Sequence, residues 1–259
     1  MRRDPVELPV VALSVRSLKA TARQPQNWLP STIFPLVLAA VYTAQFGDAV
    51  NLEGFGDVDS FLEFLLPASV LQGVTFAATN GASDLAIDLE DGFFERLLAS
   101  PVRPVSILIG RLAGSAVLAV LQALVLMGVF VAFGADISAA VVPAVAAAAV
   151  MLALSIGAIA SALAFWTGNQ ESVQSLFPVT FIGLFISSAF FPTEAMSGWY
   201  RWLAERNPVT FLIDPTRRLV LDGMDGSDLA MMLGVGLAMT AAGIGVALAA
   251  LRYRLRETS

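Results

Sequence analysis

One short stretch of the chain is rich in charged side chains that could do chemistry. Seven of them lie within residues 84–104, between two long apolar segments. The chain has no cysteine and no histidine, so it offers no disulfide, no thiolate or imidazole metal ligand and no Ser-His catalytic pair. These absences exclude thiol- and histidine-based chemistry and leave open what the charged stretch contacts.

Nucleotide binding through a phosphate-cradling loop is also excluded. A loop of the type G-x-x-x-x-G-K-[ST] needs a lysine that follows a glycine. The single lysine, Lys19, lies between Leu18 and Ala20. If the chain takes part in active transport, the energy must therefore come from another polypeptide.

The charged stretch has the pattern of an amphipathic surface helix. Its apolar residues recur at helical spacing: Phe93, Phe94, Leu97 and Leu98. Its charged residues alternate with them: Glu90, Asp91, Glu95 and Arg96. A helix with one apolar flank and one charged flank lies at a membrane boundary and not inside a bilayer.

The composition of the rest of the chain is that of a membrane protein. Of the 259 residues, 57% are hydrophobic and 14% are charged, and the mean hydropathy is +0.75. Soluble domains carry about 25% charged residues. The net charge of −6 is unlike that of a nucleic-acid binder. We therefore expect a lipid bilayer, and no nucleic acid, as a partner.

Six runs without Asp, Glu, Lys or Arg are long enough to cross a bilayer, since a span needs about 20 residues. The sequence therefore predicts an all-α polytopic protein with a single transmembrane domain over 1–259. Its expected spans cover about 27–47, 62–83, 106–134, 143–166, 172–193 and 229–251. Because the charge-free runs hold no intramembrane carboxylate or histidine, a proton-driven carrier and an intramembrane protease are disfavoured.

Basic residues indicate how the chain is oriented. Eleven of the fifteen Lys and Arg residues lie in 1–23, 84–111 and 252–256, whereas 48–63 has none. The positive-inside rule therefore predicts a cell-membrane protein with both termini and 84–111 in the cytoplasm. Four exceptions fall in the outer connection 194–228, where nearby acids could pair with them. These exceptions are Arg201, Arg206, Arg217 and Arg218.

Further helices are expected at the membrane surfaces. Residues 8–23 have apolar residues at a 4-3-4 spacing and basic residues on another face, which predicts an amphipathic helix ended by Pro25. A partly ordered basic leader is the alternative. Residues 196–205 and 209–221 predict two short helices on or in the outer leaflet, because prolines and charges interrupt a region rich in interfacial aromatics.

Polar residues form a stripe along the second expected span and a milder one along the fifth. The members that could line a pathway are Ser69, Gln72, Thr75, Thr79, Thr180 and Ser187, with Phe76 sharing the register of Thr75. Such stripes face another helix or a water-filled path, because lipid offers polar groups no partner. Plain helix packing is the alternative. Gln72 is the strongest pathway candidate because it is the bulkiest polar group of the second span.

Two stretches resemble the patterns of ABC-2 type transporter permeases. The first is Asp88 to Arg111, which contains Gly92, Glu95-Arg96-Leu97-Leu98, Ser100-Pro101-Val102 and Gly110-Arg111. The second contains Phe190-Phe191-Pro192, Trp199, Asn207-Pro208-Val209-Thr210 and Arg217-Arg218. Arg23 to Pro25 fits the same family. Among its members, the chain looks most like the daunorubicin/doxorubicin-resistance drug exporters, although polysaccharide and lipid exporters share the architecture.

The resemblance implies an assembly and a role for the charged stretch. Two permease subunits would pair, as two copies of this chain or as this chain and a paralogue, above two separate cytoplasmic ATPase subunits. These ATPases, and not this chain, would bind ATP and Mg²⁺. Residues 8–23 would form the connecting helix, Glu90 to Ser100 the coupling helix and 196–221 the outer re-entrant helices. Spans two and five would line the route.

The residues expected to couple to the ATPase are Asp88, Glu90, Gly92, Phe93, Glu95, Arg96, Leu97, Ser100 and Pro101. The chain departs from the family pattern at Phe93-Phe94, where smaller or polar residues are expected after the glycine. The leading hypothesis is a permease subunit, without its own nucleotide site, that exports a hydrophobic or amphipathic compound. An ATP-independent channel and a non-transporting assembly subunit are the alternatives.

Overall fold

The computed structural model describes residues 25–51, 55, 58, 60–98 and 104–257, and every regular element within them is a helix. Five helices of this described part are long and apolar enough to cross a membrane. They are Leu29–Asn51, Phe61–Glu90, Pro104–Ala132, Val142–Thr167 and Gly226–Arg256. The expected all-helical membrane architecture is thus confirmed. The expected helix at 8–23 lies outside the described residues.

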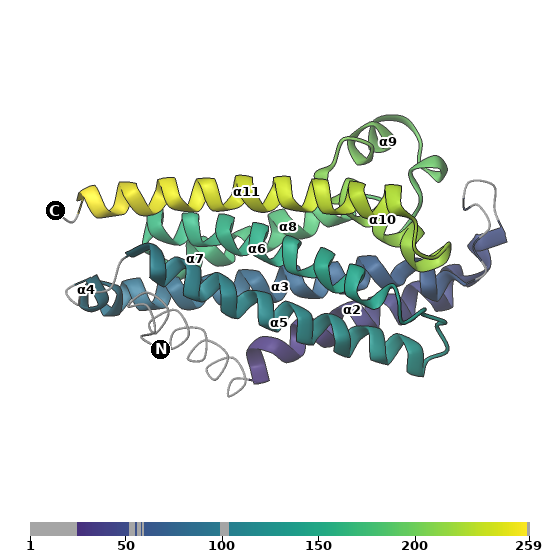
Figure 1. Cartoon of the computed structure of the whole chain (residues 1–259), viewed down its shortest axis with the longest axis horizontal. Helices are drawn as coiled ribbons and strands as arrows, with labels where there is room; N and C mark the ends of the chain where they lie inside the picture. The colour runs from purple at the N-terminus through teal and green to yellow at the C-terminus, as the bar shows by residue number, and fades with distance from the viewer. Residues whose placement is uncertain (1–24, 52–54, 56–57, 59, 99–103, 258–259) are drawn as a thin grey trace.

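The long helices run side by side along the longest axis of the molecule (Figure 1). They are α2 (Pro25–Phe46), α3 (Phe61–Glu90), α5 (Pro104–Ala132), α6 (Val142–Thr167) and α11 (Gly226–Glu257). The short helix α4 (Phe93–Leu98) lies at one end of this bundle, together with the end of α11. Helices α9 (Gly198–Ala204) and α10 (Pro208–Leu221) lie at the other. We refer to these as the α4 end and the α10 end.

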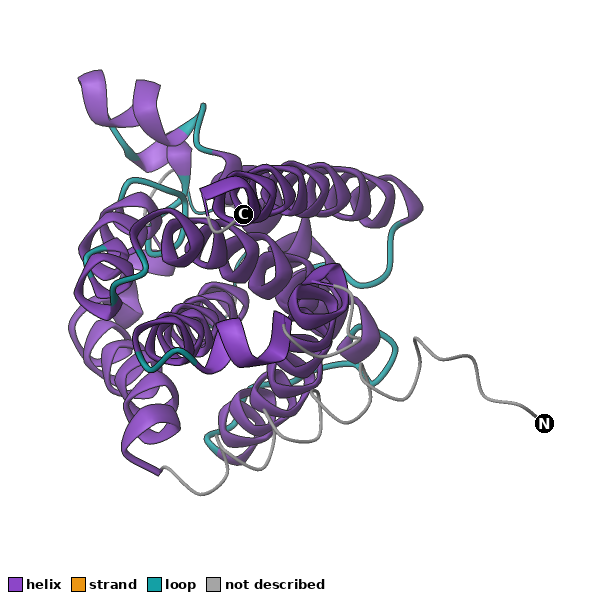
Figure 2. Cartoon of the chain, turned by 90° about the vertical axis from the view of Figure 1, so that its left-hand side faces the viewer, coloured by secondary structure: helices purple, strands orange, loops and turns teal. Residues whose placement is uncertain are grey.

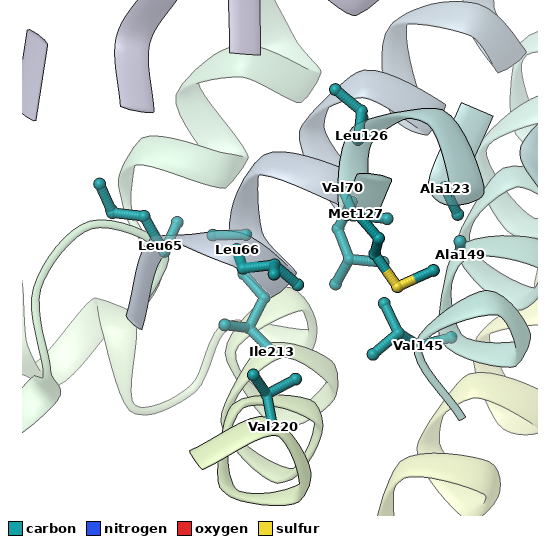
Figure 3. Packing of buried hydrophobic residues seen from close by; sticks show 14 of the residues in the cluster. Leu65, Leu66, Val70, Ala123, Leu126, Met127, Val145, Ala149, Ile213 and Val220 are labelled. Carbon is teal, nitrogen blue, oxygen red and sulfur yellow. The ribbon is translucent and has the colours of Figure 1, made fainter. Parts of the chain in front are cut away.

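Helix α3 is the most enclosed span. In the most apolar 18-residue stretch of α3, 83% of the residues are buried, against 17% in the corresponding stretches of α2 and α11. Figure 2 shows the helices grouped around one another in an end-on view. Leu66 of α3 belongs to a buried cluster with Met127 of α5, Val145 of α6 and Ile213 of α10 (Figure 3). This helix therefore positions the elements at both ends of the bundle.

Helix α3 is longer than the sequence pattern predicts. It continues to Glu90, beyond the expected end at residue 83. Its 30 residues correspond to a length of about 45 Å, whereas the hydrocarbon core is about 30 Å thick. Charged residues end a membrane span but not a helix, so Asp88 and Glu90 lie in the last turns of α3 and not in a separate surface helix.

The expected span at 172–193 is not a continuous helix, and this expectation needs correction. The chain forms α7 (Gln170–Gln174), a turn at Ser175 and α8 (Leu176–Phe185). Pro178 explains the break, because proline has no N–H for the carbonyl of Gln174 and its ring clashes with that carbonyl. After α8 the chain leaves the helical conformation at Ile186.

Two short helices occupy the connection that was expected to contain them. Helix α9 (Gly198–Ala204) and helix α10 (Pro208–Leu221) match the expectations for 196–205 and 209–221. Two short 3-10 turns, η1 (Gly47–Asn51) and η2 (Thr193–Ala195), complete the described helices. Both the start of α2 and the end of α11 lie toward the α4 end (Figure 1).

Candidate functional site

At the α4 end, a glycine turn joins α3 to the short helix α4. Asp91 caps α3, its N–H donating to the carbonyl of Ile87 at 2.9 Å. Gly92 follows with a φ of 65°, in the left-handed region that residues with a Cβ rarely adopt. The chain can therefore turn tightly into α4, which runs from Phe93 to Leu98 and contains Glu95, Arg96 and Leu97. Ser100 and Pro101 lie outside the described residues.

The two phenylalanines after Gly92 have different surroundings. Phe94 is only 1% exposed, and its ring centroid lies 5.6 Å from that of Phe165 in α6. Phe93 is half-buried, and the guanidinium carbon of Arg96 lies 5.7 Å from its ring centroid. The departure from the family pattern thus has a physical reason, since Phe94 anchors α4 in the bundle and Phe93 stays near the surface.

Phe94 belongs to a second buried cluster that is separate from the main core. It joins the end of α3 and α4 to four other elements. Its large members include Leu85, Phe94, Ile107, Leu108, Phe165, Val173 and Leu251. These residues come from α3, α4, α5, α6, α7 and α11. Helix α4 is therefore packed, through this cluster, against residues of α3, α5, α6, α7 and α11.

Two carboxylates reinforce this attachment. Asp88 of α3 forms an ion pair with Arg111 of α5. Glu90 accepts a hydrogen bond from the backbone N–H of Gln170, the first residue of α7, at 2.8 Å. A carboxylate at this position is favourable because the first N–H groups of a helix lack intrahelical partners. The structure thus shows what Asp88 and Glu90, two of the expected coupling residues, contact. The sequence pattern could not identify these contacts.

The polar stripe of α3 is buried inside the chain. Ser69, Gln72, Thr75 and Thr79 are all enclosed. Thr75 donates to the carbonyl of Leu71 at 2.8 Å, and Thr79 donates to that of Thr75 at 3.0 Å. The amide of Gln72, 1% exposed, has no hydrogen-bond partner in the described structure. Helix packing thus accounts for the two threonines, whereas the environment of Gln72 leaves a polar group unsatisfied.

The candidate pathway residues of α8 and of the turn after it also bond locally. Thr180 is half-buried and donates to the carbonyl of Leu176 at 3.0 Å, and buried Ser187 donates to that of Leu184. Helices α3 and α8 meet instead through aromatic rings, with the centroids of Phe76 and Phe177 4.7 Å apart. Whether these residues line a route stays a prediction.

At the α10 end, side chains satisfy the last carbonyls of α8. The amide of Asn207 donates to the carbonyls of Gly183 and Ile186, both at 2.6 Å. Its oxygen accepts from the N–H of Val209 at 2.9 Å and so caps the start of α10. The hydroxyl of Tyr200 donates to the carbonyl of Phe185. Asn207 therefore joins two helices, a role that its place in a sequence motif does not indicate.

Arg217 of α10 is buried, with 5% of its surface exposed. Its Nε donates to the carbonyl of Phe64 in α3 at 3.0 Å. Its Nη2 donates to the carbonyls of Ser188 and Ala189, after α8, at 2.7 and 2.9 Å. Its Nη1 donates to Asp214 at 3.1 Å, and the guanidinium carbon lies 3.7 Å from the ring centroid of Phe64. One side chain thus connects three elements.

Burial has opposite consequences for the two charges of this ion pair. Desolvation lowers the pKa of Arg217 to about 10, against the attraction of Asp214. Desolvation also raises the pKa of Asp214, although Arg217 opposes this shift. A guanidinium with this pKa is still charged at neutral pH, so the carbonyls around Arg217 compensate a full positive charge.

The other arginines that depart from the positive-inside pattern also have partners. Arg218 binds Asp228 at the start of α11 at 2.6 Å, and Arg201 binds Glu205 at 2.7 Å. The guanidinium carbon of Arg206 lies 4.5 Å from the ring centroid of Trp202. The expectation that nearby acids pair with arginines of this connection is therefore confirmed for three of the four. Sequence reasoning did not show that Arg217 itself is buried or that it also binds backbone carbonyls.

The described residues hold no group of three or more acids that could bind a metal ion. The geometry of the described residues does not by itself name a protein family, but a comparison with known families does. The family model described as "ABC-2 type transporter" matches residues 9–221. The chain belongs to the ABC-2 type transporter family.

Relatives of this ABC-2 chain include permeases named for drug resistance. It is 25% identical over 234 residues to the daunorubicin resistance ABC transporter permease protein DrrB1 of Streptomyces coeruleorubidus, covering 87% of this chain and 80% of the relative. It is 27% identical over 248 residues to the probable doxorubicin resistance permease DrrC of Mycobacterium tuberculosis, covering 94% and 87%. The putative transport permease ycf38 of Cyanophora paradoxa is 26% identical over 205 residues, covering 76% and 69%.

Membership identifies the chain as a multi-pass membrane permease subunit of an ABC exporter. Its 259 residues carry no phosphate-cradling motif of the G-x-x-x-x-G-K-[ST] type. An ABC permease of this kind works with an ATPase subunit, which supplies the energy that this chain has no motif to obtain.

Proposed function

We propose that this permease exports a hydrophobic or amphipathic compound, using ATP hydrolysed by two cytoplasmic ATPase subunits that dock at the α4 end. The buried anchor of α4 carries this proposal. Because Phe94 packs against Phe165 and Glu90 binds the start of α7, a push on α4 moves the bundle as well. In this proposal ATP and Mg²⁺ bind to the partner and not to this chain.

The proposed arrangement in the membrane extends the five candidate spans to six passages. Helices α7 and α8, together with the turn that α10 covers, form the additional passage between α6 and α9. The α4 end and both termini face the cytoplasm, and α9 and α10 lie at the outer surface. A second permease subunit faces α3 and α8, which flank the route between the two subunits.

The substrate class follows from what the spans lack. A route without Asp, Glu, Lys or Arg within the hydrocarbon offers no compensating charge to a small, highly charged solute. The names of the two drug-resistance relatives support an amphipathic, drug-like compound over a polysaccharide.

The coupling role of α4 is tested by transport in proteoliposomes that contain the permease and its ATPase. We expect Glu95→Arg and Gly92→Pro to leave the protein in the membrane but to abolish ATP-dependent export. Gly92→Pro is disruptive because proline cannot adopt the φ of 65°. Glu205→Arg, which reverses an exposed charge at the α10 end, is the matched control and should retain export.

Two outcomes would contradict the proposal. Export that survives both changes in α4, with its dependence on ATP intact, would show that α4 does not couple the subunits. Flux through liposomes that contain the chain alone would indicate an ATP-independent channel instead.

A further inference from the structure

The hydrogen bonds of Arg217 join the α10 ends of two helices that are distant in sequence. Phe64 lies in the first turn of α3, and Ser188 and Ala189 follow directly after α8. The guanidinium bonds to both segments at once, at 3.0 Å on the α3 side and at 2.7 and 2.9 Å on the α8 side. A change in the separation of these two segments therefore breaks bonds of one charged group.

The segment after α8 is held by α10 from two directions. The N–H of Ser188 donates to the hydroxyl of Thr210 at 3.1 Å, and the carbonyl of Ser188 accepts from Arg217. Thr210 lies in the first turn of α10, and Arg217 lies about two turns further along the same helix. This segment and α10 thus move as one body, and the bond between Arg217 and Phe64 connects that body to α3.

The environment of the guanidinium makes this connection strong. Arginine has five N–H donors in a rigid fork, and four of them are used here. A buried charge that loses its partners is strongly unfavourable, because it cannot regain solvation in an apolar surrounding. The α10 end consequently has a closed arrangement in which all of these bonds form together, and opening breaks several of them.

We propose that Arg217 is a positioning residue that holds the α10 ends of α3 and α8 together and so closes the route at this end. This inference rests on the proposed function, in which α3 and α8 flank the route. In this proposal α3 moves away from the segment after α8 within each subunit when the route between the subunits opens at the α10 end, and the bond between Arg217 and Phe64 then breaks. Arg217 would thereby set when the route opens.

The neighbouring Arg218 provides a matched control. It has the same side chain on the same helix, but it is exposed and binds Asp228 of α11 at 2.6 Å. In the described structure its guanidinium bonds to Asp228 and not to α3 or α8, so its loss removes a charge from α10 without loosening the closed arrangement.

Thiol accessibility tests the proposal directly, because the chain has no cysteine of its own. Ser69→Cys places a buried thiol in α3 one to two turns from Phe64, and Ser83→Cys places one near the α4 end of the same helix. The full chain is reconstituted in lipid nanodiscs without ATP. The rate of modification by a membrane-impermeant methanethiosulfonate reagent is then measured with and without Arg217→Gln.

We expect Arg217→Gln to raise the modification rate at residue 69 at least tenfold and to leave the rate at residue 83 unchanged. Arg218→Gln should change neither rate. If Arg217→Gln does not yield folded protein, Arg217→Lys is used with the same reporters. A lysine keeps the charge but replaces the planar five-donor fork with one compact ammonium group, so it cannot reproduce all four bonds, and the rate at residue 69 should again rise selectively.

Two results would overturn the proposal. An unchanged rate at residue 69 would show that Arg217 does not close this end, and equal increases at residues 69 and 83 would show that it merely stabilises the fold. Because the measurement needs neither transport nor ATP hydrolysis, either result leaves the proposed export function standing. Conversely, a permease without ATP-dependent export would lose that function even if the thiol rates behave as expected.

Discussion

At the α4 end a buried ring, Phe94 against Phe165, attaches the short surface helix to the bundle, whereas at the α10 end hydrogen bonds to backbone carbonyls add to the apolar packing of Ile213. Apolar contacts are not directional, so α4 can tilt by a small angle and still remain packed. Hydrogen bonds weaken steeply when their angle changes, so those of Asn207 and Arg217 form or break as a set. We therefore expect the α4 end to transmit a graded movement and the α10 end to switch between two arrangements.

The largest effect should follow from removing the apolar anchor. Phe94→Ala deletes a buried ring, and we expect a loss of about 3–5 kcal/mol in the free energy of unfolding. Phe93→Ala, at a half-buried ring on the same turn, should cost less than about 1.5 kcal/mol. Unfolding of the purified permease in mixed micelles with increasing SDS measures both. Equal losses for the two variants would remove the distinction between the anchored and the surface phenylalanine.

The sequence predicts the α4 end better than the α10 end. Apolar patterns can be read from the side chains, whereas bonds to backbone carbonyls cannot. Long apolar runs predict spans because the bilayer requires them, and this worked for α2, α3, α5, α6 and α11. The break between α7 and α8 has a local signal in Pro178, which the absence of charge in this run obscured. Apolar spacing also predicted the amphipathic pattern of α4, although not that Phe94 would be its buried anchor.

The α10 end could not be derived in this way. Asn207 and Arg217 bind carbonyls that lie 21 to 153 residues away in the sequence, and backbone acceptors leave no trace in side-chain pattern. The available signal was that two adjacent arginines of this helix, Arg217 and Arg218, depart from the positive-inside rule. A charge in such a position indicates a buried partner, but only the fold shows that the partners are the ends of α3 and α8.

An intermediate effect should follow from removing the polar attachment at the α10 end. Asn207→Ala deletes the cap of α10 and leaves the carbonyls of Gly183 and Ile186 without these donors, so we expect a loss of about 2–3 kcal/mol. Ser197→Ala is the control, because the side chain of Ser197 makes no capping bond to α9, and it should change stability by less than about 0.5 kcal/mol. SDS unfolding measures the pair. If Asn207→Ala behaves like its control, the hydrogen bonds at this end do not hold α8 and α10 together.

The smallest effect concerns a hydrogen bond at the α4 end that, like those of Asn207 and Arg217, joins a side chain to the backbone of another helix. Glu90 is exposed, and its bond to the N–H of Gln170 is the polar complement to the Phe94 anchor. Glu90→Ala should therefore cost only about 0.5–1 kcal/mol, since water can replace the lost acceptor. Glu90→Gln keeps an acceptor oxygen, so its stability should lie between that of the unchanged protein and that of Glu90→Ala. Glu171→Ala, at an exposed acid of the same α7 turn, serves as the control.

The effect of Glu90 on coupling should exceed its effect on stability, and this would sharpen the contrast between the two ends. If Glu90 helps to carry movement from α4 to α7, Glu90→Ala lowers the amount of substrate exported per ATP hydrolysed, with ATPase activity retained. Both rates are measured on the same proteoliposomes. A loss of export in strict proportion to ATPase activity would assign transmission to the apolar cluster alone, because the ring contact of Phe94 with Phe165 is unchanged in this variant.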